Sequence, residues 1–389
     1  KWEIILSTLR FLTAGESHGP SLTAILEGIP AGLSLRLENI NRDLARRQQG
    51  YGRGGRMKIE RDTVRILSGV RFGETIGSPI TLSVENRDWQ NWQERMAAFG
   101  EAHGEKVTAA RPGHADLTGA RKYAREDIRD ILERASARET AMRVAVGAVA
   151  KELLFALGVT VESAVLDIGG VAADAAKRET GAAHKAASEL NCFDAEAEER
   201  MKEKIRAAKE AGDTLGGIFE VRIAGAPLGL GSHIQWDRRL DARFAAAMMS
   251  IQAIKGVEIG AGFGYAALLG SEAHDEMFLG ENDSVVRRTN RAGGLEGGMT
   301  NGEDIVIRAV MKPIPTLMKP LHSVDIEKKA PVLASKERSD VCAVPAASVV
   351  GEAMAAFVLA EAFIEKFDSD NMRDMKADVA AYKKRTEEA

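Results

Sequence analysis

The chain has 389 residues, of which 45% are hydrophobic and 28% charged, and its formal net charge is -4. This composition is typical of a soluble globular protein, and it argues against a general nucleic-acid or membrane-surface binder. The two cysteines, Cys192 and Cys342, exclude a disulfide scaffold or a cysteine-based zinc site and favour a cytoplasmic location. No apolar run approaches the ~20 residues of a membrane span, and residues 1–8 are expected to be an extension without assigned function.

The first half of the chain predicts paired strands followed by a helical block. Alternation of apolar and polar residues indicates half-buried strands at 21–28, 63–70 and 79–85. A helix is expected over 37–49, with Asn39 or Asn41 as its N-cap. Residues 116–157 contain no proline and are expected to be mostly helical.

The second half continues with the same two kinds of element. Strands are expected at 161–171, 217–224 and 304–311, and helices at 172–213, 239–254 and 347–366. Strands and helices do not alternate regularly, so a doubly wound parallel sheet is not favoured. We expect an α+β protein with antiparallel sheets and long central helices, forming a single domain over residues 9–389.

Short strings that combine arginine, histidine and glycine point to function. They lie at residues 15–19, 46–57, 111–116, 134–138, 290–302 and 338–340. Arginine binds phosphate and carboxylate through paired hydrogen bonds, and glycine lets the backbone approach the same anion. Together the strings predict an enzyme site for a large, flat, multiply anionic ligand.

Two histidines in these strings are candidates for proton transfer. His18 stands between glycines and could donate a proton to a leaving group, although a turn histidine bonded to its own backbone is the alternative. His114 follows a rigid Pro112-Gly113 turn, and Asp116 is a candidate cap for the next helix. Asp340 adds a carboxylate, for which a surface ion pair is the alternative.

The arginines allow further interpretations. The run 46–57 holds four arginines and four glycines, which also suits a single-strand nucleic-acid binder or a disordered loop. Arg134 and Arg138 are spaced four apart and are expected to share one helix face, unless Glu133 and Glu139 simply pair with nearby arginines on a solvated face.

No histidine spacing suggests a metal site, and the glycines of 290–302 lack the ending of a P-loop.

Taken together, the strings resemble the signatures of the chorismate synthase family over about residues 9–382. The matching strings are Thr13-Ala14-Gly15-Glu16-Ser17-His18-Gly19, Gly50-Tyr51-Gly52-Arg53-Gly54, Arg111-Pro112-Gly113-His114-Ala115-Asp116, Arg134-Ala135-Ser136-Ala137-Arg138-Glu139-Thr140 and the run from Arg338-Ser339-Asp340 to Ala346. The resemblance implies a β-α-β sandwich, with central helices packed between antiparallel sheets, and a homotetramer.

The resemblance also implies a reaction of the shikimate pathway. Phosphate is eliminated from 5-enolpyruvylshikimate 3-phosphate in an anti 1,4-elimination that gives chorismate, with reduced FMN as a transient electron donor. An NADPH-dependent FMN reductase and a nucleic-acid-binding protein that uses the Arg/Gly loop are the alternatives. We expect neither a nucleic acid nor a membrane as partner.

Residue roles follow from the resemblance. His18 corresponds to the histidine that protonates the departing phosphate, His114 to the one that protonates the reduced flavin, and Asp340 to the aspartate that helps flavin N5 act as a base. The implied substrate-binding residues are Arg47, Arg53, Arg56, Arg111, Arg134 and Arg338. The implied FMN-binding residues are Arg134, Ala135, Ser136, Gln252, Ala253, Gly297, Lys312, Pro313, Ile314, Pro315, Thr316 and Arg338. Arg47 and Arg53 are the positions that the family links to NADPH.

Overall fold

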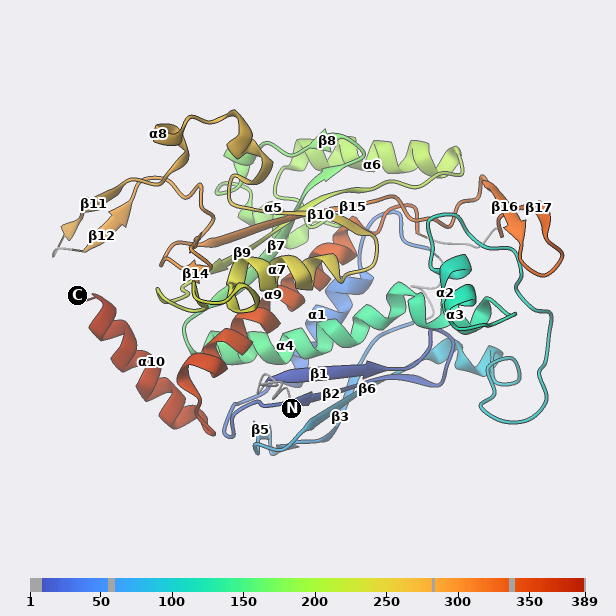
Figure 1. The fold of residues 1–389 in the computed structure, drawn as a ribbon, viewed down its shortest axis with the longest axis horizontal. Helices are drawn as coiled ribbons and strands as arrows, with labels where there is room; N and C mark the ends of the chain where they lie inside the picture. Colours follow the sequence, from blue (N-terminus) through green and yellow to red (C-terminus); the bar gives the residue numbers. More distant parts are fainter. Residues whose placement is uncertain (1–8, 55–59, 282–283, 336–339, 388–389) are drawn as a thin grey trace.

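The computed structural model describes residues 9–54, 60–281, 284–335 and 340–387. Two antiparallel sheets enclose a layer of helices (Figure 1). The first sheet has the order β1 (Arg10–Ala14), β2 (Ser21–Glu27), β6 (Ile80–Glu85) and β3 (Val64–Ser68). The second has the order β10 (Ile254–Ile259), β15 (Ile305–Met311), β9 (Gly217–Ala224), β7 (Thr160–Ile168) and β8 (Val171–Ala172). The expected α+β sandwich is confirmed.

The middle layer is formed by long helices. They are α1 (Leu37–Gln48), α4 (Thr140–Ala156), α7 (Leu240–Met249) and α9 (Val344–Phe367). Helix α4 packs on β2 and β6, whereas α9 packs on β7 and β9, so the layer joins both sheets.

Further helices and hairpins surround the sandwich. The helices are α2 (Asp116–Lys122), α3 (Arg129–Ala135), α5 (Ala182–Ala187), α6 (Ala195–Glu210), α8 (Gly270–Ala273) and α10 (Met372–Glu387). The hairpins pair β4 (Val70–Arg71) with β5 (Glu74–Thr75), β11 (Met277–Leu279) with β12 (Val285–Arg287), β13 (Leu295–Glu296) with β14 (Met299–Thr300), and β16 (His322–Asp325) with β17 (Ala330–Leu333).

The period-two pattern of β2 explains its place against the helices. Leu22 and Leu26 are each 1% exposed and face the core, whereas Ile25 is 47% exposed on the opposite face. Burying one apolar face of a strand against a helix is the main reason that such a pattern forms a sheet.

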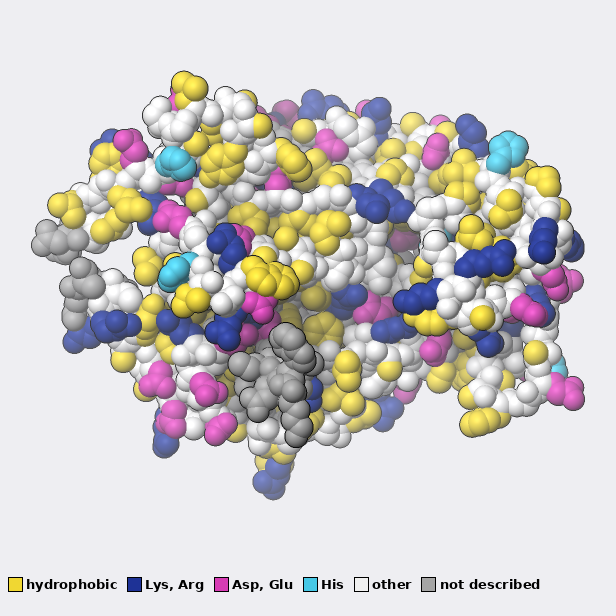
Figure 2. All heavy atoms as spheres, viewed as in Figure 1, with side chains coloured by type: hydrophobic (Ala, Val, Ile, Leu, Met, Phe, Trp, Pro, Cys, Tyr) yellow, Lys and Arg dark blue, Asp and Glu magenta, His cyan; other side chains and the backbone are white. Residues whose placement is uncertain are grey.

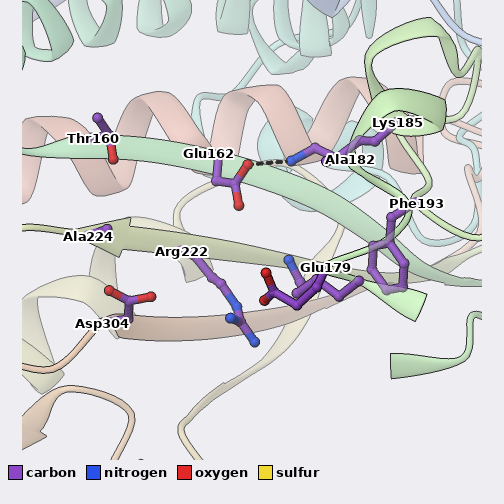
Figure 3. A pocket seen from close by; sticks show the side chains of 10 residues that line it. Thr160, Glu162, Glu179, Ala182, Lys185, Phe193, Arg222, Ala224 and Asp304 are labelled. Atoms are coloured by element: carbon purple, nitrogen blue, oxygen red, sulfur yellow. Dashed lines mark hydrogen bonds and ion pairs between the residues drawn. The ribbon is translucent and has the colours of Figure 1, made fainter. Parts of the chain in front are cut away.

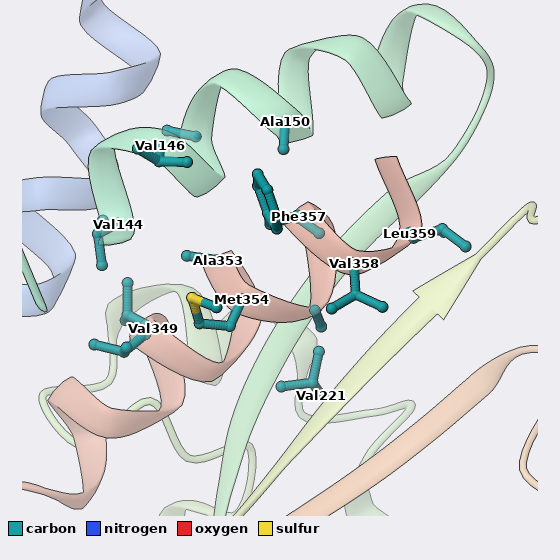
Figure 4. Close-up of a cluster of buried hydrophobic side chains, with 14 of the residues drawn as sticks. Val144, Val146, Ala150, Val221, Val349, Ala353, Met354, Phe357, Val358 and Leu359 are labelled. Carbon is teal, nitrogen blue, oxygen red and sulfur yellow. The ribbon is translucent and has the colours of Figure 1, made fainter. Parts of the chain in front are cut away.

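Helices α4 and α9 cross closely at the centre of the core (Figure 4). The approach is closest at Gly147, where an added Cβ would lie 2.3 Å from Cβ of Ala353. By length and hydropathy, the 24 residues of α9 could cross a membrane, although the sequence analysis expected no such segment. However, 94% of the most apolar 18-residue stretch of this helix is buried within the fold. Helix α9 is therefore placed as a core helix.

The expected element boundaries need three corrections. The helix expected over 172–213 is two separate helices, α5 and α6, with the non-helical residues 188–194 between them. Helix α1 begins after Arg36 without a side-chain cap, because Asn39 binds Glu152 and Asn41 accepts a hydrogen bond from the backbone of β3. The helix expected over 239–254 ends at Met249, and Ala253 adopts φ of +68° before β10 begins. Tertiary contacts and a left-handed residue thus decided the last two of these boundaries.

The expectation of one domain over residues 9–389 stays a prediction. It is supported by a main hydrophobic cluster that draws residues from both sheets and from α1, α4, α7, α9 and α10. Residues 1–8 lie outside the described residues.

Candidate active site

Four of the arginine and histidine strings meet around the N-terminal end of α4. Backbone N–H of Ser17 donates to the carbonyl of Glu133 at 3.0 Å, which joins the β1–β2 turn to α3. The string 46–57 follows α1, and Arg47 reaches Thr140, the first residue of α4. Segments more than 90 residues apart in the chain thus form one polar region.

The helix expected to carry both Arg134 and Arg138 is interrupted. Helix α3 ends at Ala135, Ser136 is extended with ψ of 140°, and a short 3₁₀ turn η3 (Ala137–Glu139) follows. Arg134 is exposed and donates to the carbonyls of the β1–β2 region, whereas Arg138 is 4% exposed and pairs with Asp62 at 2.6 Å. The expectation of a shared helix face was wrong because the break turns the two side chains to different partners.

Arg47 is fully engaged inside the protein. Its three guanidinium nitrogens donate to Thr140 Oγ1 at 3.0 Å, the carbonyl of residue 137 at 3.1 Å and Asp62 at 3.3 Å. Burial lowers the pKa of Arg47 to about 10; Asp62 opposes this change, and the positive charges of Arg138 and Arg53 add to it. Arg47 stays charged at neutral pH, in a cluster where Arg138 and Arg53 are likewise paired with carboxylates.

The end of the same string approaches Asp340. Arg53 Nη1 lies 2.6 Å from Asp340 Oδ2, and the backbone N–H of Gly54 donates to Asp340 Oδ1 at 2.6 Å. Arg46 points elsewhere and forms a two-fold ion pair with the buried Glu352. Arg56 and Arg338 lie outside the described residues, so their roles stay predictions.

His114 and Arg111 share one carboxylate. Asp116 contacts His114 Nδ1 and accepts hydrogen bonds from Arg111 Nε at 2.8 Å and Nη2 at 3.1 Å. Burial alone would raise the pKa of Asp116, but hydrogen bonds from His114 and Arg111 hold it well below its ordinary value. Asp116 is the first residue of α2 and provides no side-chain cap, because its oxygens are used by these two residues instead.

The implied FMN residues of the segment 312–316 contact the string that carries this histidine. Lys312 Nζ donates to the carbonyl of Gly113 at 2.6 Å, and Arg111 donates to Thr316 at 3.3 Å. The backbone N–H of Lys312 donates to the carbonyl of Ala253, so Gln252 and Ala253 join the segment 312–316. Ala135 and Ser136 lie at the break between α3 and η3. Glu139, the last residue of η3, accepts a hydrogen bond from the side chain of Gln252.

Gly297 is the exception among the implied FMN residues. It lies in the β13–β14 turn, where the neighbouring Gly298 carbonyl accepts from the first residue of α7. The Gln252 region follows the opposite end of this ten-residue helix, which spans about 15 Å. Within one chain, Gly297 is therefore not brought together with Gln252.

His18 has a partner that the sequence analysis did not assign. Its Nδ1 lies 3.0 Å from both carboxylate oxygens of Glu133, so the alternative of a histidine bonded to its own backbone is wrong. Glu133 is 2% exposed, which also excludes the solvated ion pair considered for it. Glu133, Asp62 and Asp116 were missed as site partners because nothing in the local sequence separates a carboxylate that will be buried from one at the surface.

A cavity lies away from these residues. It has a volume of about 270 Å³ over β7 and β9, and none of the predicted site residues that the structure describes lines it (Figure 3). Several of its charged side chains are paired, among them Glu162 with Lys185 at 2.6 Å and Arg222 with Glu220 at 2.9 Å. Within the described ranges, no group of three or more His, Cys, Asp or Glu residues is arranged to hold a metal ion.

Comparison with known proteins identifies the family. A family model described as chorismate synthase matches residues 9–364. The chorismate synthase of Geobacter sulfurreducens is 60% identical over 385 residues, covering 96% of this chain and 98% of that protein, and that of Desulforamulus reducens is 60% identical over 374 residues, covering 95% and 97%. A solved structure of chorismate synthase superposes with a TM-score of 0.79 at 47% identity, covering 98% of this chain and 99% of the other. The chain therefore belongs to the chorismate synthase family of lyases.

Proposed function

We propose that the chain converts 5-enolpyruvylshikimate 3-phosphate to chorismate by anti 1,4-elimination of phosphate, with reduced FMN bound. One observation carries the proposal beyond family membership. Two histidines, each with Nδ1 held by a carboxylate, and the Arg53–Asp340 pair belong to strings that the family resemblance marks as catalytic. This arrangement suits an anionic substrate that needs positioning and proton transfer.

The residues present fit a flavin. Gln252 Oε1 is buried and has no hydrogen-bond partner among the described residues, so it is an acceptor in need of a donor such as the flavin ring provides. Lys312 and Arg134 supply cationic groups nearby for the FMN phosphate. When bound in its reduced form, FMN would supply a transient electron as the C–O bond breaks and recover it as the C6 hydrogen is lost.

The chain's own residues would bind the substrate and move protons. Arg53, Arg134 and Arg47, which stays charged although it is buried, orient the phosphate and carboxylates of the substrate. His18 holds a proton at Nε2 for an oxygen of the departing phosphate. We assign His114 and Asp340 to the flavin side of the site, with Asp116 keeping His114 Nδ1 in place.

The nucleic-acid alternative has less support. Among the described arginines of the string 46–57, Arg46 is paired with Glu352, Arg47 with Asp62 and Arg53 with Asp340. Figure 2 shows acidic side chains interspersed with Lys and Arg on the visible face rather than one continuous basic surface. Both observations count against an arginine-rich arm that would track a phosphate backbone.

The decisive experiment is anaerobic turnover. Purified protein is mixed with 5-enolpyruvylshikimate 3-phosphate and chemically reduced FMN, and phosphate release is followed together with chorismate absorbance. Equal amounts of both products support the proposal, whereas folded, flavin-binding protein that forms neither product overturns it. Replacing reduced FMN by oxidised FMN and NADPH tests the flavin reductase alternative, which predicts NADPH oxidation as the main activity.

We further propose that the enzyme is a cytoplasmic homotetramer. Exposed apolar side chains support self-association, among them Leu12 of edge strand β1 at 75% and Leu279 of the β11–β12 hairpin at 77%. The thiols of Cys192 and Cys342 are both free and buried, which suits a reducing compartment. Light scattering after size-exclusion chromatography tests the tetramer.

A further inference from the structure

His18 is held by contacts from two directions. It stands in the turn between β1 and β2 with a side chain 19% exposed, and its backbone N–H donates to Glu133 Oε2 at 2.8 Å. The ring nitrogen Nδ1 lies 3.0 Å from both oxygens of the same carboxylate. Backbone and ring are therefore fixed by one side chain from α3.

Glu133 is itself fixed as a carboxylate. Arg129, one turn earlier on α3, pairs with Glu133 Oε1 at 2.9 Å. Burial alone would raise the pKa of Glu133, but hydrogen bonds and charge from His18 and the charge of Arg129 lower it below its ordinary value. Glu133 thus accepts hydrogen bonds at neutral pH and does not take the proton from His18.

An indole orients the ring plane of His18. Trp92, which follows the 3₁₀ turn η2 (Arg87–Asn91), stacks on His18 with ring centroids 4.0 Å apart and planes at 29°. Arg129 lies over the same indole at 4.9 Å, and the indole N–H donates to Asp88 at 3.1 Å. Asp88 Oδ2 is 3.9 Å from His18 Nε2, beyond hydrogen-bonding distance, so Nε2 has no hydrogen-bond partner among the described residues.

We propose that Glu133 is a positioning residue, which keeps a proton on Nδ1 of His18 so that Nε2 delivers the catalytic proton, while Trp92 fixes the plane of the ring. The inference rests on the proposed function. As the bond between carbon and the phosphate oxygen breaks, the Nε2 proton passes to that oxygen. The Nδ1 proton stays hydrogen-bonded to Glu133, so the product is one defined tautomer of neutral imidazole.

The test is a double-mutant cycle between Glu133→Gln and His18→Ala. If Glu133 acts through His18, Glu133→Gln lowers kcat by about 10–100-fold, the usual cost of losing a group that orients a functional histidine. The KM for 5-enolpyruvylshikimate 3-phosphate stays within about threefold, and the same substitution has no further effect in the His18→Ala background. Equal losses in both backgrounds would mean a merely structural role and overturn the inference.

A matched control exists outside the site. Glu198 is a carboxylate 1% exposed that binds His184 Nε2 at 2.6 Å and Lys202 at 3.3 Å, away from the residues above. Glu198→Gln removes a comparable buried interaction and is expected to leave kcat unchanged.

Folding and function are separated by further measurements. Thermal unfolding and FMN titration identify variants that fold and bind flavin. If Glu133→Gln does not fold, Arg129→Gln replaces it in the cycle and is expected to lower kcat in the wild-type background alone. Inactive wild-type protein would refute the proposed function, whereas active wild type with unaltered kcat in Glu133→Gln would refute this inference alone.

Discussion

The close crossing of α4 and α9 predicts a large effect of a single methyl group at Gly147. In Gly147→Ala, the new Cβ would lie 2.3 Å from Cβ, 2.5 Å from Cα and 2.6 Å from the carbonyl oxygen of Ala353. Carbon atoms pack at about 3.5–4.0 Å, so the two helices must separate by about 1 Å. Backbone atoms cannot rotate away as a side chain would, so the strain spreads along both helices.

The magnitude follows from two opposing contributions. Alanine gains about 1 kcal/mol over glycine in a helix interior, and overpacking costs about 1–3 kcal/mol or more. Because the clash involves backbone atoms, we take the upper end and expect a net loss of about 2 kcal/mol. With an unfolding entropy of about 2.1 cal/mol/K per residue, the 389 residues give about 0.8 kcal/mol/K, so Tm falls by about 2–3 °C.

The assay is denaturant and thermal unfolding followed by circular dichroism. Gly264→Ala is the control, because an added Cβ there meets open space, and its effect is expected within about 0.5 kcal/mol. Adding Ala353→Gly to Gly147→Ala removes one of the three clashing atoms and should restore only part of the lost stability. A Gly147→Ala protein as stable as the wild type would refute the packing argument.

Three other predictions concern the site and the buried charges. His18→Ala is expected to lower turnover by roughly 10²–10⁴-fold, measured as phosphate release, because it removes a positioned acid; near-normal turnover would exclude His18 from the mechanism. Gln252→Leu is expected to weaken FMN binding in fluorescence titration with little loss of stability, since Oε1 has no partner among the described residues. Glu352→Gln removes one of the two buried carboxylates that pair with Arg46 and Lys151, and because Asp43 still pairs with both, the expected cost at neutral pH is below the roughly 3–5 kcal/mol of a fully uncompensated buried charge. Burial alone would raise the pKa of Glu352, but the charges of Lys151 and Arg46 hold this pKa below the unfolded value of 4.5. The ionised Glu352 therefore stabilises the fold above that pH, and this stabilisation is lost as the pH falls below it. Unfolding free energies of Glu352→Gln should therefore change less than those of the wild type as the pH falls below 4.5, and equal pH dependence in that range would contradict this assignment.

The sequence by itself determined the elements that depend on local pattern. The strand predicted over 217–224 is β9 within the same bounds, and the strand over 21–28 is β2, because one buried face imposes a period of two. The long apolar helix near the C-terminus, α9, was also predicted from the local sequence. It is buried around nearly its whole circumference and not on one face only. Family membership was also available from the sequence, since several short strings in a fixed order carry more information than any one element.

Only the tertiary structure decided which charges meet. His18 and Glu133 are 115 residues apart, and Arg46 and Glu352 are 306 apart, so no local spacing could pair them. The break at Ser136 likewise separated Arg134 from Arg138 against their helical spacing, and Arg138 pairs with the buried Asp62. Periodicity reports which face of a segment is buried, whereas the partner of a charged side chain depends on what the rest of the chain brings to that face.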